Sequence, residues 1–305
     1  MGIVYFDNSA TTKMSEGAKK KMLDTATMHF GNPSSLHSIG LDAEKEISYA
    51  RTVIAKSLGA LRAGKNEIVF TSGGTESNNI AILGTVFSKK RKGNEKILTT
   101  EGEHASVEEP LAFLEKMGYN IVRVPTKNGE LDLEFLRANA DGAILATFMH
   151  VNNETGALYD LKKAFEIVKE RSPEAVLHSD CVQSYLKVKF SIKSLGADLI
   201  SVSGHKVNGP KGVGALYVSP EIIKAKKISP LFYGGGQARE VYHCAACCIC
   251  GQYICGQRVC RFFNNLQGAL CSTLQEDETL GEVDLATRRE GLERVEYRTM
   301  SVWCK

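Results

Sequence analysis

The sequence predicts an α/β fold built on a mostly parallel, seven-stranded sheet flanked by helices. Seven short, β-rich apolar runs lie between residues 60 and 220, and segments with helical periodicity separate several of them. Strands that alternate with helices are joined by crossover connections, which produce a largely parallel sheet. Ligands bind such sheets at the carboxyl ends of the strands, so candidate functional residues are sought there.

The individual elements follow from composition and periodicity. The candidate strands are Ile68–Phe70, Ile97–Thr100, Ile121–Pro125, Ala143–Phe148, Ala175–His178, Leu199–Val202 and Gly214–Val218. The candidate helices are Ser77–Ser88, Ala105–Met117, Asp160–Glu170 and residues 42–58. The last of these is predicted to begin at Asp42 and to end at Gly59, after a loop over residues 30–40 that is rich in Gly, Asn, Pro and Ser.

Composition favours an ordinary globular protein. The chain has 305 residues, 43% of them hydrophobic and 24% charged. A net charge of +3 is small for this length and does not indicate a nucleic-acid partner. No apolar run approaches the roughly 20 residues that span a bilayer, and the first residues do not resemble a secretory signal. We therefore expect no membrane association and a cytoplasmic location.

The cysteines divide the chain in two. Cys181 is the only cysteine before residue 244, and the remaining eight are Cys244, Cys247, Cys248, Cys250, Cys255, Cys260, Cys271 and Cys304. The block over residues 241–260 has neither helical nor strand periodicity, and its cysteine spacings lack the regular pairs of a structural zinc site. We therefore expect one domain over residues 1–237 and a divergent tail over residues 238–305, with no metal site.

Two segments at strand ends carry candidate anion-binding and acidic groups. FTSGGTESNN, at residues 70–79, passes from a strand through a Gly-Gly turn into a helix, whose N-terminal N–H groups can receive a phosphate. The alternative is a Gly-rich turn in which Thr75 is the helix N-cap. LHSDCVQS, at residues 177–184, ends a buried strand at Asp180, where a carboxylate is costly without a cation or a donor. The alternative for Asp180 is a helix cap.

Three further residues lie at other strand ends. Lys206 follows a strand within SVSGHKVNGPKGVGALYV, and a lysine held in a pocket can lose its proton and form a Schiff base. His104 and Asn153 follow two more strands. Each residue alone favours an ordinary structural role, such as a solvated loop lysine. Together they supply an anion cradle, a buried acid, a lysine, an aromatic base and amides, which is the set that a pyridoxal phosphate site requires.

At these positions the sequence resembles the cysteine desulfurases, a group of class V aminotransferases among the fold-type I pyridoxal phosphate enzymes. The motifs, in the family's order and spacing, are YFDNSATT, FGNPSS-H, TSGGTESNN, EH, HVNNETG, HSDCVQ, SGHK-GPKGVGALYV and GGGQ. The last of them occupies Gly234–Gln237. The resemblance implies that residues 1–237 form the large, cofactor-binding domain.

The resemblance also implies a role for each site residue. Lys206 would form the Schiff base with the cofactor, Asp180 would keep the pyridine nitrogen protonated, and His104 would stack on the ring as an acid/base. The remaining cofactor-binding residues would be Asn153 and Gln183 at the ring, and Gly74, Thr75, Ser203 and His205 at the phosphate. The family forms homodimers, converts L-cysteine to L-alanine, and transfers the sulfur to an enzyme cysteine and then to an acceptor protein, as in iron–sulfur cluster assembly.

The resemblance stops after Gln237. The family continues with an Arg-Ser-Gly-Thr stretch, whereas this chain reads AREVYHCAACC. We find no counterpart of the second, smaller domain, of the loop bearing the nucleophilic cysteine, or of the arginine that holds the substrate carboxylate. A tail that is out of frame would explain this, and the chain's own activity would then be impaired. The alternatives are another class V enzyme, such as a selenocysteine lyase or an aminotransferase-like protein, and an inactive cofactor-binding fragment.

Overall fold

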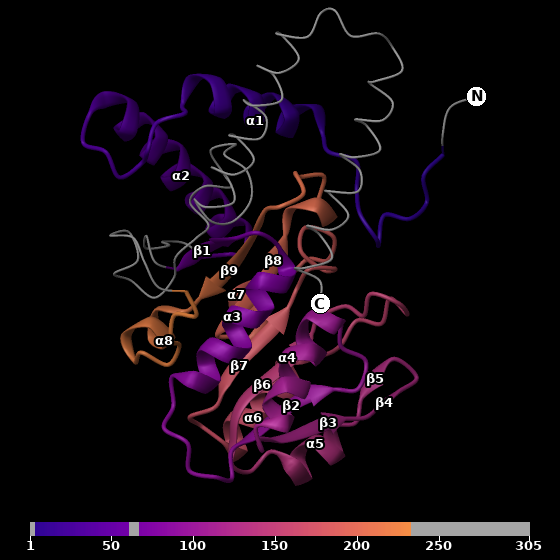
Figure 1. Ribbon diagram of the computed structural model, residues 1–305. Coiled ribbons are helices and arrows are strands. Elements are labelled where there is room, and N and C mark those ends of the chain that lie inside the picture. Colours follow the sequence, from indigo (N-terminus) through magenta and orange to yellow (C-terminus); the bar gives the residue numbers. More distant parts are fainter. Residues whose placement is uncertain (1–3, 61–66, 233–305) are drawn as a thin grey trace, which may run out of the picture. The chain divides into compact units, whose positions relative to one another are not determined.

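A seven-stranded sheet forms the centre of the protein. The computed structural model describes residues 4–60 and 67–232, all within one compact unit. The strands of the sheet are β1 (Ile68–Thr71), β2 (Lys96–Thr100), β3 (Asn120–Val124), β6 (Ala143–Met149), β7 (Val176–Asp180), β8 (Leu199–Ser203) and β9 (Gly214–Val218). Their order is β1-β9-β8-β7-β6-β2-β3, and only β9 runs antiparallel to its neighbours (Figure 1). The predicted α/β class with a mostly parallel sheet is confirmed.

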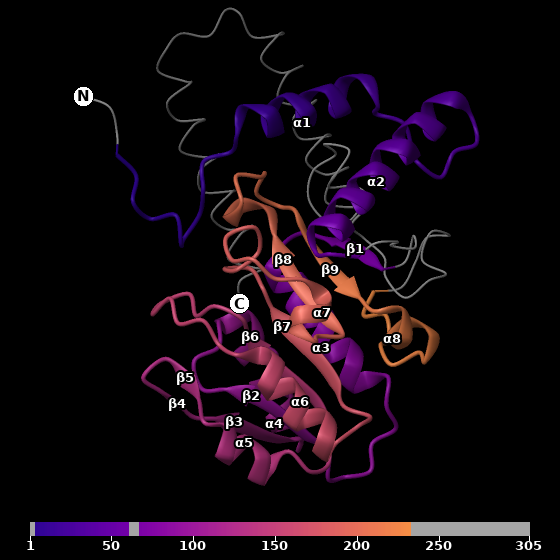
Figure 2. The same cartoon turned by 180° about the vertical axis from the view of Figure 1, so that it is seen from behind.

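Helices cover both faces of this sheet. On one face lie α3 (Gly74–Phe87), α4 (Ala105–Lys116) and α8 (Pro220–Lys224), which are in front of the strands in Figure 1. On the other lie α5 (Leu133–Asn139), α6 (Leu161–Arg171) and α7 (Ile192–Leu195), which are in front in Figure 2, and the end of α2 (Ser38–Ser57). The remaining elements are α1 (Glu16–Met28), the hairpin of β4 (Thr126–Lys127) and β5 (Glu130–Leu131), and the 3₁₀ turn η1 (Gly204–Lys206).

Alternation along the strands builds two separate cores. In β6, Leu145 packs into the cluster beneath α3 and α4, whereas Ala146 and Phe148 pack into the cluster beneath α6. Phe148 stacks on Phe165 of α6, with ring centroids 5.6 Å apart. Burying an aromatic side chain of this size contributes about 1.5–3 kcal/mol, so these contacts hold α6 against the sheet.

The structure agrees with every predicted strand and corrects the starts of two helices. The seven predicted strands all occur in the sheet, with ends shifted by no more than two residues. The helix predicted over Ser77–Ser88 begins at Gly74. The helix predicted to begin at Asp42 begins instead at Ser38, because His37 Nδ1 accepts a hydrogen bond from the Gly40 N–H (3.3 Å) and caps the helix. An imidazole nitrogen can serve as a cap acceptor, so the helix extends into the segment predicted as a loop.

Some sequence predictions lie outside the described residues. They concern the GGGQ motif at residues 234–237 and the whole tail over residues 238–305 with its cysteines. Within the two described ranges, no helix has both the length and the hydropathy needed to cross a membrane.

The fold predicts that Gly214 is a sensitive position. Gly214 opens β9 between Thr71 of β1 and Ser203 of β8. A Cβ there would lie 2.7 Å from the Gly73 Cα and 2.8 Å from Thr71 Oγ1, and the backbone cannot yield cheaply. We expect Gly214→Ala to lower the free energy of unfolding by about 1–3 kcal/mol, measured by denaturant titration.

Gly17 provides the matched control. It lies in α1, and an added Cβ would meet nothing within 4 Å. Gly17→Ala should leave the free energy of unfolding unchanged or raise it by up to about 1 kcal/mol, because alanine loses less backbone entropy in a helix. A Gly214→Ala variant as stable as the wild type would contradict the close approach of β9 to the turn before α3.

Candidate active site at the carboxyl edge of the sheet

The structure brings the predicted site residues to one edge of the sheet. β1, β8, β7, β6 and β2 all run in the same direction, because β9 is antiparallel to both β1 and β8. Their carboxyl ends therefore meet at the same edge. Each end supplies part of the candidate set: Gly74 after β1, His104 after β2, Asn153 after β6, Asp180 at the end of β7 and Lys206 after β8.

Asp180 is the buried acid of this edge. It is 6% exposed, its Oδ2 accepts from Asn78 Nδ2 at 2.7 Å, and its Oδ1 accepts from the Val182 N–H at 2.9 Å. Burial raises the pKa of Asp180, whereas these hydrogen bonds and the positive charges of His104 and Lys206 act to lower it. The carboxylate is thus fixed in orientation and favours a cationic partner. The Val182 contact also caps the turn that follows β7, so Asp180 has a local structural role as well.

A chain of hydrogen bonds joins His104 to Asp180. His104 is the N-cap of α4, and its Nδ1 accepts from the Ser106 N–H at 3.1 Å and lies 2.8 Å from Ser106 Oγ. Asn78 Nδ2 donates both to Ser106 Oγ (2.8 Å) and to Asp180. We call these four side chains the His104–Asp180 network. Sequence reasoning did not single out Asn78 or Ser106, although both belong to motifs that it quoted.

This network also fixes the tautomer of the imidazole. Because Nδ1 of His104 accepts from the Ser106 amide, it cannot carry the proton of a neutral ring. That proton therefore resides on Nε2. The His104 side chain is exposed, so this nitrogen is the one available to a ligand.

Lys206 lies in the 3₁₀ turn after β8. Its Nζ donates a hydrogen bond to the carbonyl oxygen of Ser9. Burial is the main cause that lowers the pKa of Lys206, and the negative charges of Asp180 and Asp7 oppose it. A lysine with a lowered pKa more readily provides the neutral amine that a Schiff base requires.

The N-terminal segment holds the Lys206 turn in place. The N–H and the hydroxyl of Thr12 both donate to the His205 carbonyl oxygen at 2.8 Å. Gln183, predicted at the cofactor ring, donates from Nε2 to the Ser9 carbonyl oxygen at 2.9 Å. Ser9 thus accepts hydrogen bonds from both Lys206 and Gln183, and this part of the YFDNSATT motif forms one wall of the edge.

The amino end of α3 has unpaired donors. Its N-cap is Gly73, without a side-chain cap, so the predicted alternative of Thr75 as N-cap is wrong. The hydroxyl of Ser203 is buried and has no hydrogen-bond partner among the described residues. A Cβ on Gly74 would lie 2.7 Å from Val182 Cγ2, so the close packing requires glycine there. Free helix N–H groups beside an unpaired buried hydroxyl are the donors that a phosphate takes.

The remaining predicted cofactor-binding residues are Thr75 and His205, expected at the phosphate, and Asn153, expected at the ring. Thr75 is exposed in the first turn of α3. His205 is partly buried, and its Nδ1 lies 3.1 Å from Thr11 Oγ1. Burial lowers the pKa of His205, with further contributions from Lys206 and other lysines. Asn153 is half-buried in the turn after β6, which its neighbour Asn152 closes by accepting from the Glu154 and Thr155 N–H groups.

Taken together, the donor set fits pyridoxal phosphate. Asp180 can accept from a pyridine N–H, Lys206 can bond to an aldehyde, and the amino end of α3 with Ser203 can hold a phosphate. In the described part of the chain, no group of three or more His, Cys, Asp or Glu side chains is arranged to hold a metal ion.

The one cysteine of the described residues does not belong to this site. Cys181 follows Asp180 directly but is fully buried, with its Sγ 3.4 Å from Ser179 Oγ. Burial raises the pKa of Cys181 to about 12. A reactive cysteine needs an accessible thiolate, so Cys181 is a core residue.

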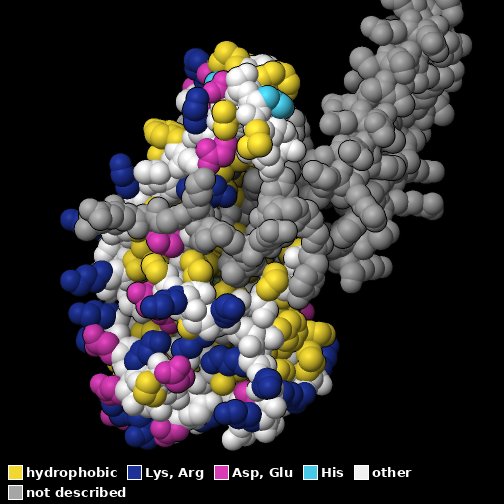
Figure 3. Space-filling view, turned by 90° about the vertical axis from the view of Figure 1, so that its left-hand side faces the viewer, with side chains coloured by type: hydrophobic (Ala, Val, Ile, Leu, Met, Phe, Trp, Pro, Cys, Tyr) yellow, Lys and Arg dark blue, Asp and Glu magenta, His cyan; other side chains and the backbone are white. Residues whose placement is uncertain are grey.

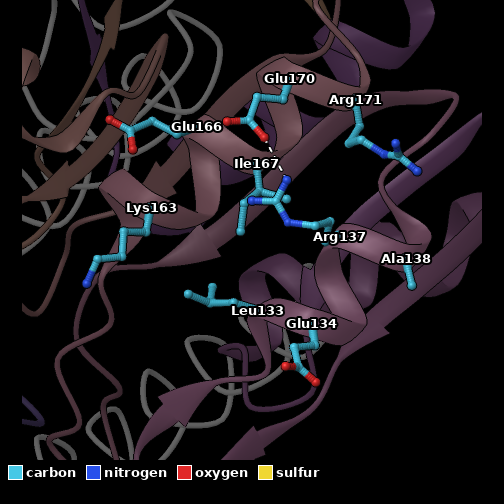
Figure 4. Close-up of a pocket in the computed structure, with 9 residues that line it drawn as sticks. All are labelled: Leu133, Glu134, Arg137, Ala138, Lys163, Glu166, Ile167, Glu170 and Arg171. Carbon is cyan, nitrogen blue, oxygen red and sulfur yellow. Dashed lines mark hydrogen bonds and ion pairs between the residues drawn. The ribbon is translucent and has the colours of Figure 1, made fainter.

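Two surface hollows accompany the fold. One of about 640 Å³ lies between α5 and α6, where Arg137 Nη1 reaches Glu170 Oε2 at 2.7 Å (Figure 4). None of the predicted site residues lines it. The other, of about 860 Å³, lies beside the carboxyl edge and is lined by Glu103, Asn152 and Tyr159 among others. None of the predicted site residues lines it either. Glu103 was not a predicted site residue, and only the tertiary structure shows that its carboxyl lies at this edge.

Comparison with known proteins agrees with this geometry. The aminotransferase class-V family matches residues 4–248. The cysteine desulfurase IscS of Dictyoglomus turgidum is 42% identical over 236 residues, which are 77% of this chain and 57% of that protein. The cysteine desulfurase IscS of Methanosarcina thermophila is 43% identical over 239 residues, again 57% of its length. This chain therefore spans a little over half the length of these curated relatives.

Solved structures give the same result. A NifS-like protein superposes with a TM-score of 0.75 at 34% identity, covering 81% of this chain and 67% of the other. SspA in complex with cysteine superposes with a TM-score of 0.74 at 33% identity, covering 82% and 71%. The matches in sequence and in fold lead to one conclusion. This chain belongs to the aminotransferase class-V family, and its homologues are cysteine desulfurases.

Proposed function

We propose that this chain binds pyridoxal phosphate through Lys206 and forms the cofactor-binding core of a cysteine desulfurase. The observation that carries the proposal is the buried Asp180 carboxylate at the same edge as Lys206 and the unpaired Ser203 hydroxyl. The substrate is L-cysteine, which would leave as L-alanine after its sulfur passes to an enzyme cysteine. The structure of the homologue SspA in complex with cysteine supports this substrate.

Asp180 and His104 have complementary parts in this proposal. Pyridoxal phosphate, when bound, supplies an electron sink for the substrate's α-carbon. Asp180 stabilises positive charge at the pyridine nitrogen, which its burial makes favourable, and Asn78 keeps the carboxylate in orientation. His104 lies over the edge with its Nε2 free, where it can stack on the ring and hold or release a proton.

Lys206 serves both attachment and proton transfer. Its amine would hold the cofactor, and the neutral amine could also take up a proton from the substrate's α-carbon. The lowered pKa of Lys206 favours this neutral form. The amino end of α3, Ser203 and His205 hold the phosphate, while Asn153 and Gln183 orient the ring.

Sulfur transfer needs a further thiol. Cys181 is too buried to attack a substrate sulfur, and the sequence after Gln237 does not resemble the family's cysteine loop. This favours a second candidate function, in which the chain as given binds the cofactor without desulfurating cysteine efficiently. The divergent tail over residues 238–305 is part of this proposal, as a segment that is not a native domain.

The proposal includes a homodimer and a sulfur-acceptor protein in the cytoplasm. Large apolar side chains are exposed along the N-terminal part of the chain, among them Phe6 (91%), Leu23 (63%), Leu36 (92%) and Tyr49 (65%). Figure 3 shows hydrophobic side chains over α1 and α2 at the upper end of that view. Several large exposed apolar side chains on one part of the chain favour an interaction site, and a second subunit would cover them.

The first test concerns the cofactor. We expect purified protein to take up pyridoxal phosphate with a visible absorbance, and borohydride reduction to fix it on Lys206, as peptide mass mapping would show. Lys206→Ala should abolish both signals because it removes the amine that is proposed to bond the cofactor. Lys211→Ala, in the same Gly-rich loop, should retain them. An unmodified Lys206 after reduction would refute the proposed cofactor role.

A second test concerns activity. We expect little or no sulfide release from L-cysteine by this chain, even with a reductant, because a thiol that is not delivered into the pocket loses the advantage of proximity. Cys181→Ser should change neither sulfide release nor cofactor binding. Turnover comparable to that of a full-length relative would contradict this expectation, and serine substitution of Cys244 and Cys271 in turn would then identify the thiol.

A third test concerns assembly. Sedimentation velocity should show self-association at concentrations well above micromolar. Leu36→Ser should weaken it, because it removes an apolar side chain that is 92% exposed. Leu158→Ser, at a 54% exposed position in the loop after β6, is the control and should leave self-association unchanged. A monomer at all concentrations would contradict the proposed homodimer.

A further inference from the structure

The carboxyl of Glu103 joins two strand ends at the active-site edge. Its Oε1 accepts from the Met149 N–H at the end of β6 and from Thr100 Oγ1 at the end of β2, both at 2.8 Å. The backbone pairing between β2 and β6 runs only as far as Leu98 and Ala146. One carboxyl oxygen therefore maintains the connection between these strands beyond the end of their backbone ladder.

This connection also links Glu103 to Asp180 on β7. Met149 lies opposite Asp180 in the register of β6 and β7, and the N–H of the next residue, His150, donates to the Asp180 carbonyl oxygen at 2.9 Å. Glu103 also directly precedes His104 in the chain. The hydrogen bonds of the His104–Asp180 network connect His104 to the Asp180 carboxylate. Glu103 is therefore connected to Asp180 in two ways. One is through the main chain of β6 and β7, and the other is through His104 and the His104–Asp180 network.

The surroundings of the second carboxyl oxygen disfavour a charge. Glu103 Oε2 is buried and has no hydrogen-bond partner among the described residues. The titratable groups that face this carboxyl are Asp180 on β7, Glu108 on α4 and the Tyr159 hydroxyl after β6, and none of them is a cation. Burial is the main cause that raises the pKa of Glu103 to about 8, and the charges of Asp180 and Glu108 raise it further.

We propose that Glu103 is a positioning residue that holds His104 and Asp180 in one arrangement, and that it does so as a neutral carboxylic acid. The inference rests on the proposed cofactor role of these two residues. A protonated carboxyl still accepts at Oε1, so the link between β2 and β6 is kept. It adds no second negative charge beside Asp180, and the charge that faces the pyridine nitrogen stays concentrated on Asp180.

The protonation state can be tested without the cofactor. A pKa raised from 4.5 to about 8 means that folding favours the protonated acid, so its stabilising contribution is complete below about pH 4.5 and is lost as pH rises towards 8. Glu103→Gln keeps the Oε1 acceptor and cannot ionise. We expect the free energy of unfolding of Glu103→Gln to rise relative to the wild type between pH 5 and pH 8.5. Infrared difference spectra should show a protonated carboxyl band at pH 7 that Glu103→Gln lacks.

The positioning role is tested with bound cofactor. Glu103→Gln should bind pyridoxal phosphate with an affinity within about threefold of the wild type at pH 7. Glu103→Ala, which leaves the buried Met149 N–H unpaired, should weaken binding by roughly tenfold or more and shift the pH dependence of the cofactor absorbance. Glu101→Gln, two residues away with an exposed side chain, is the matched control and should change neither property.

The possible results separate this inference from the proposed function. A wild-type chain without any cofactor absorbance refutes the proposed function, while the stability and infrared measurements still decide the state of Glu103. A Glu103→Gln variant as impaired as Glu103→Ala would overturn the neutral acid. Cofactor binding unchanged in both variants would overturn the positioning role. If Glu103→Ala does not fold, the pH dependence of Glu103→Gln remains the deciding measurement.

Discussion

The buried carboxylate of Asp180 is the constraint on which the rest of the edge depends. Removing a carboxylate from water costs several kcal/mol unless donors and cations replace the lost hydration. Asn78 and the Val182 N–H supply two donors, Ser106 of α4 accepts from the same Asn78 amide, and Lys206 brings positive charge close to the group. The elements that carry these partners, α3, α4 and the turn after β8, must therefore converge on the end of β7. Convergence at this point is also what a pyridine ring with a protonated nitrogen requires.

The antiparallel strand β9 controls how this convergence is achieved. It lies between β1 and β8, which run in the same direction. It therefore separates the turn after β1, which begins α3, from the turn after β8, which carries Lys206. The glycine at the start of β9 lets the Gly73 turn approach closely. From the N-terminal segment, Thr12 then ties down the η1 turn through the His205 carbonyl. Three segments distant in sequence thus form one wall around the lysine.

Sequence reasoning identified the strands because each is a short, β-rich apolar run, which is a property of local sequence alone. It identified Lys206, Asp180 and His104 because they follow strands in motifs that resemble a known family. It did not find Asn78, Ser106 or Glu103 as members of the site. The sequence shows these only as a polar residue within a helix, a residue near a helix start and one glutamate among several. Their importance comes from partners on other elements.

The boundary of α2 illustrates the same distinction. A histidine is an uncommon helix cap, so the pattern favoured Asp42, and only the folded loop places the His37 ring where it accepts from Gly40. The sequence by itself determined the α/β class, the seven strands and the residue types at their carboxyl ends, because periodicity and strand-end position are local properties. The tertiary structure alone decided which side chains share a proton or a hydrogen bond. Burial, and with it the pKa of Asp180, Lys206 and Glu103, depends on which elements pack around each group rather than on its neighbours in the chain.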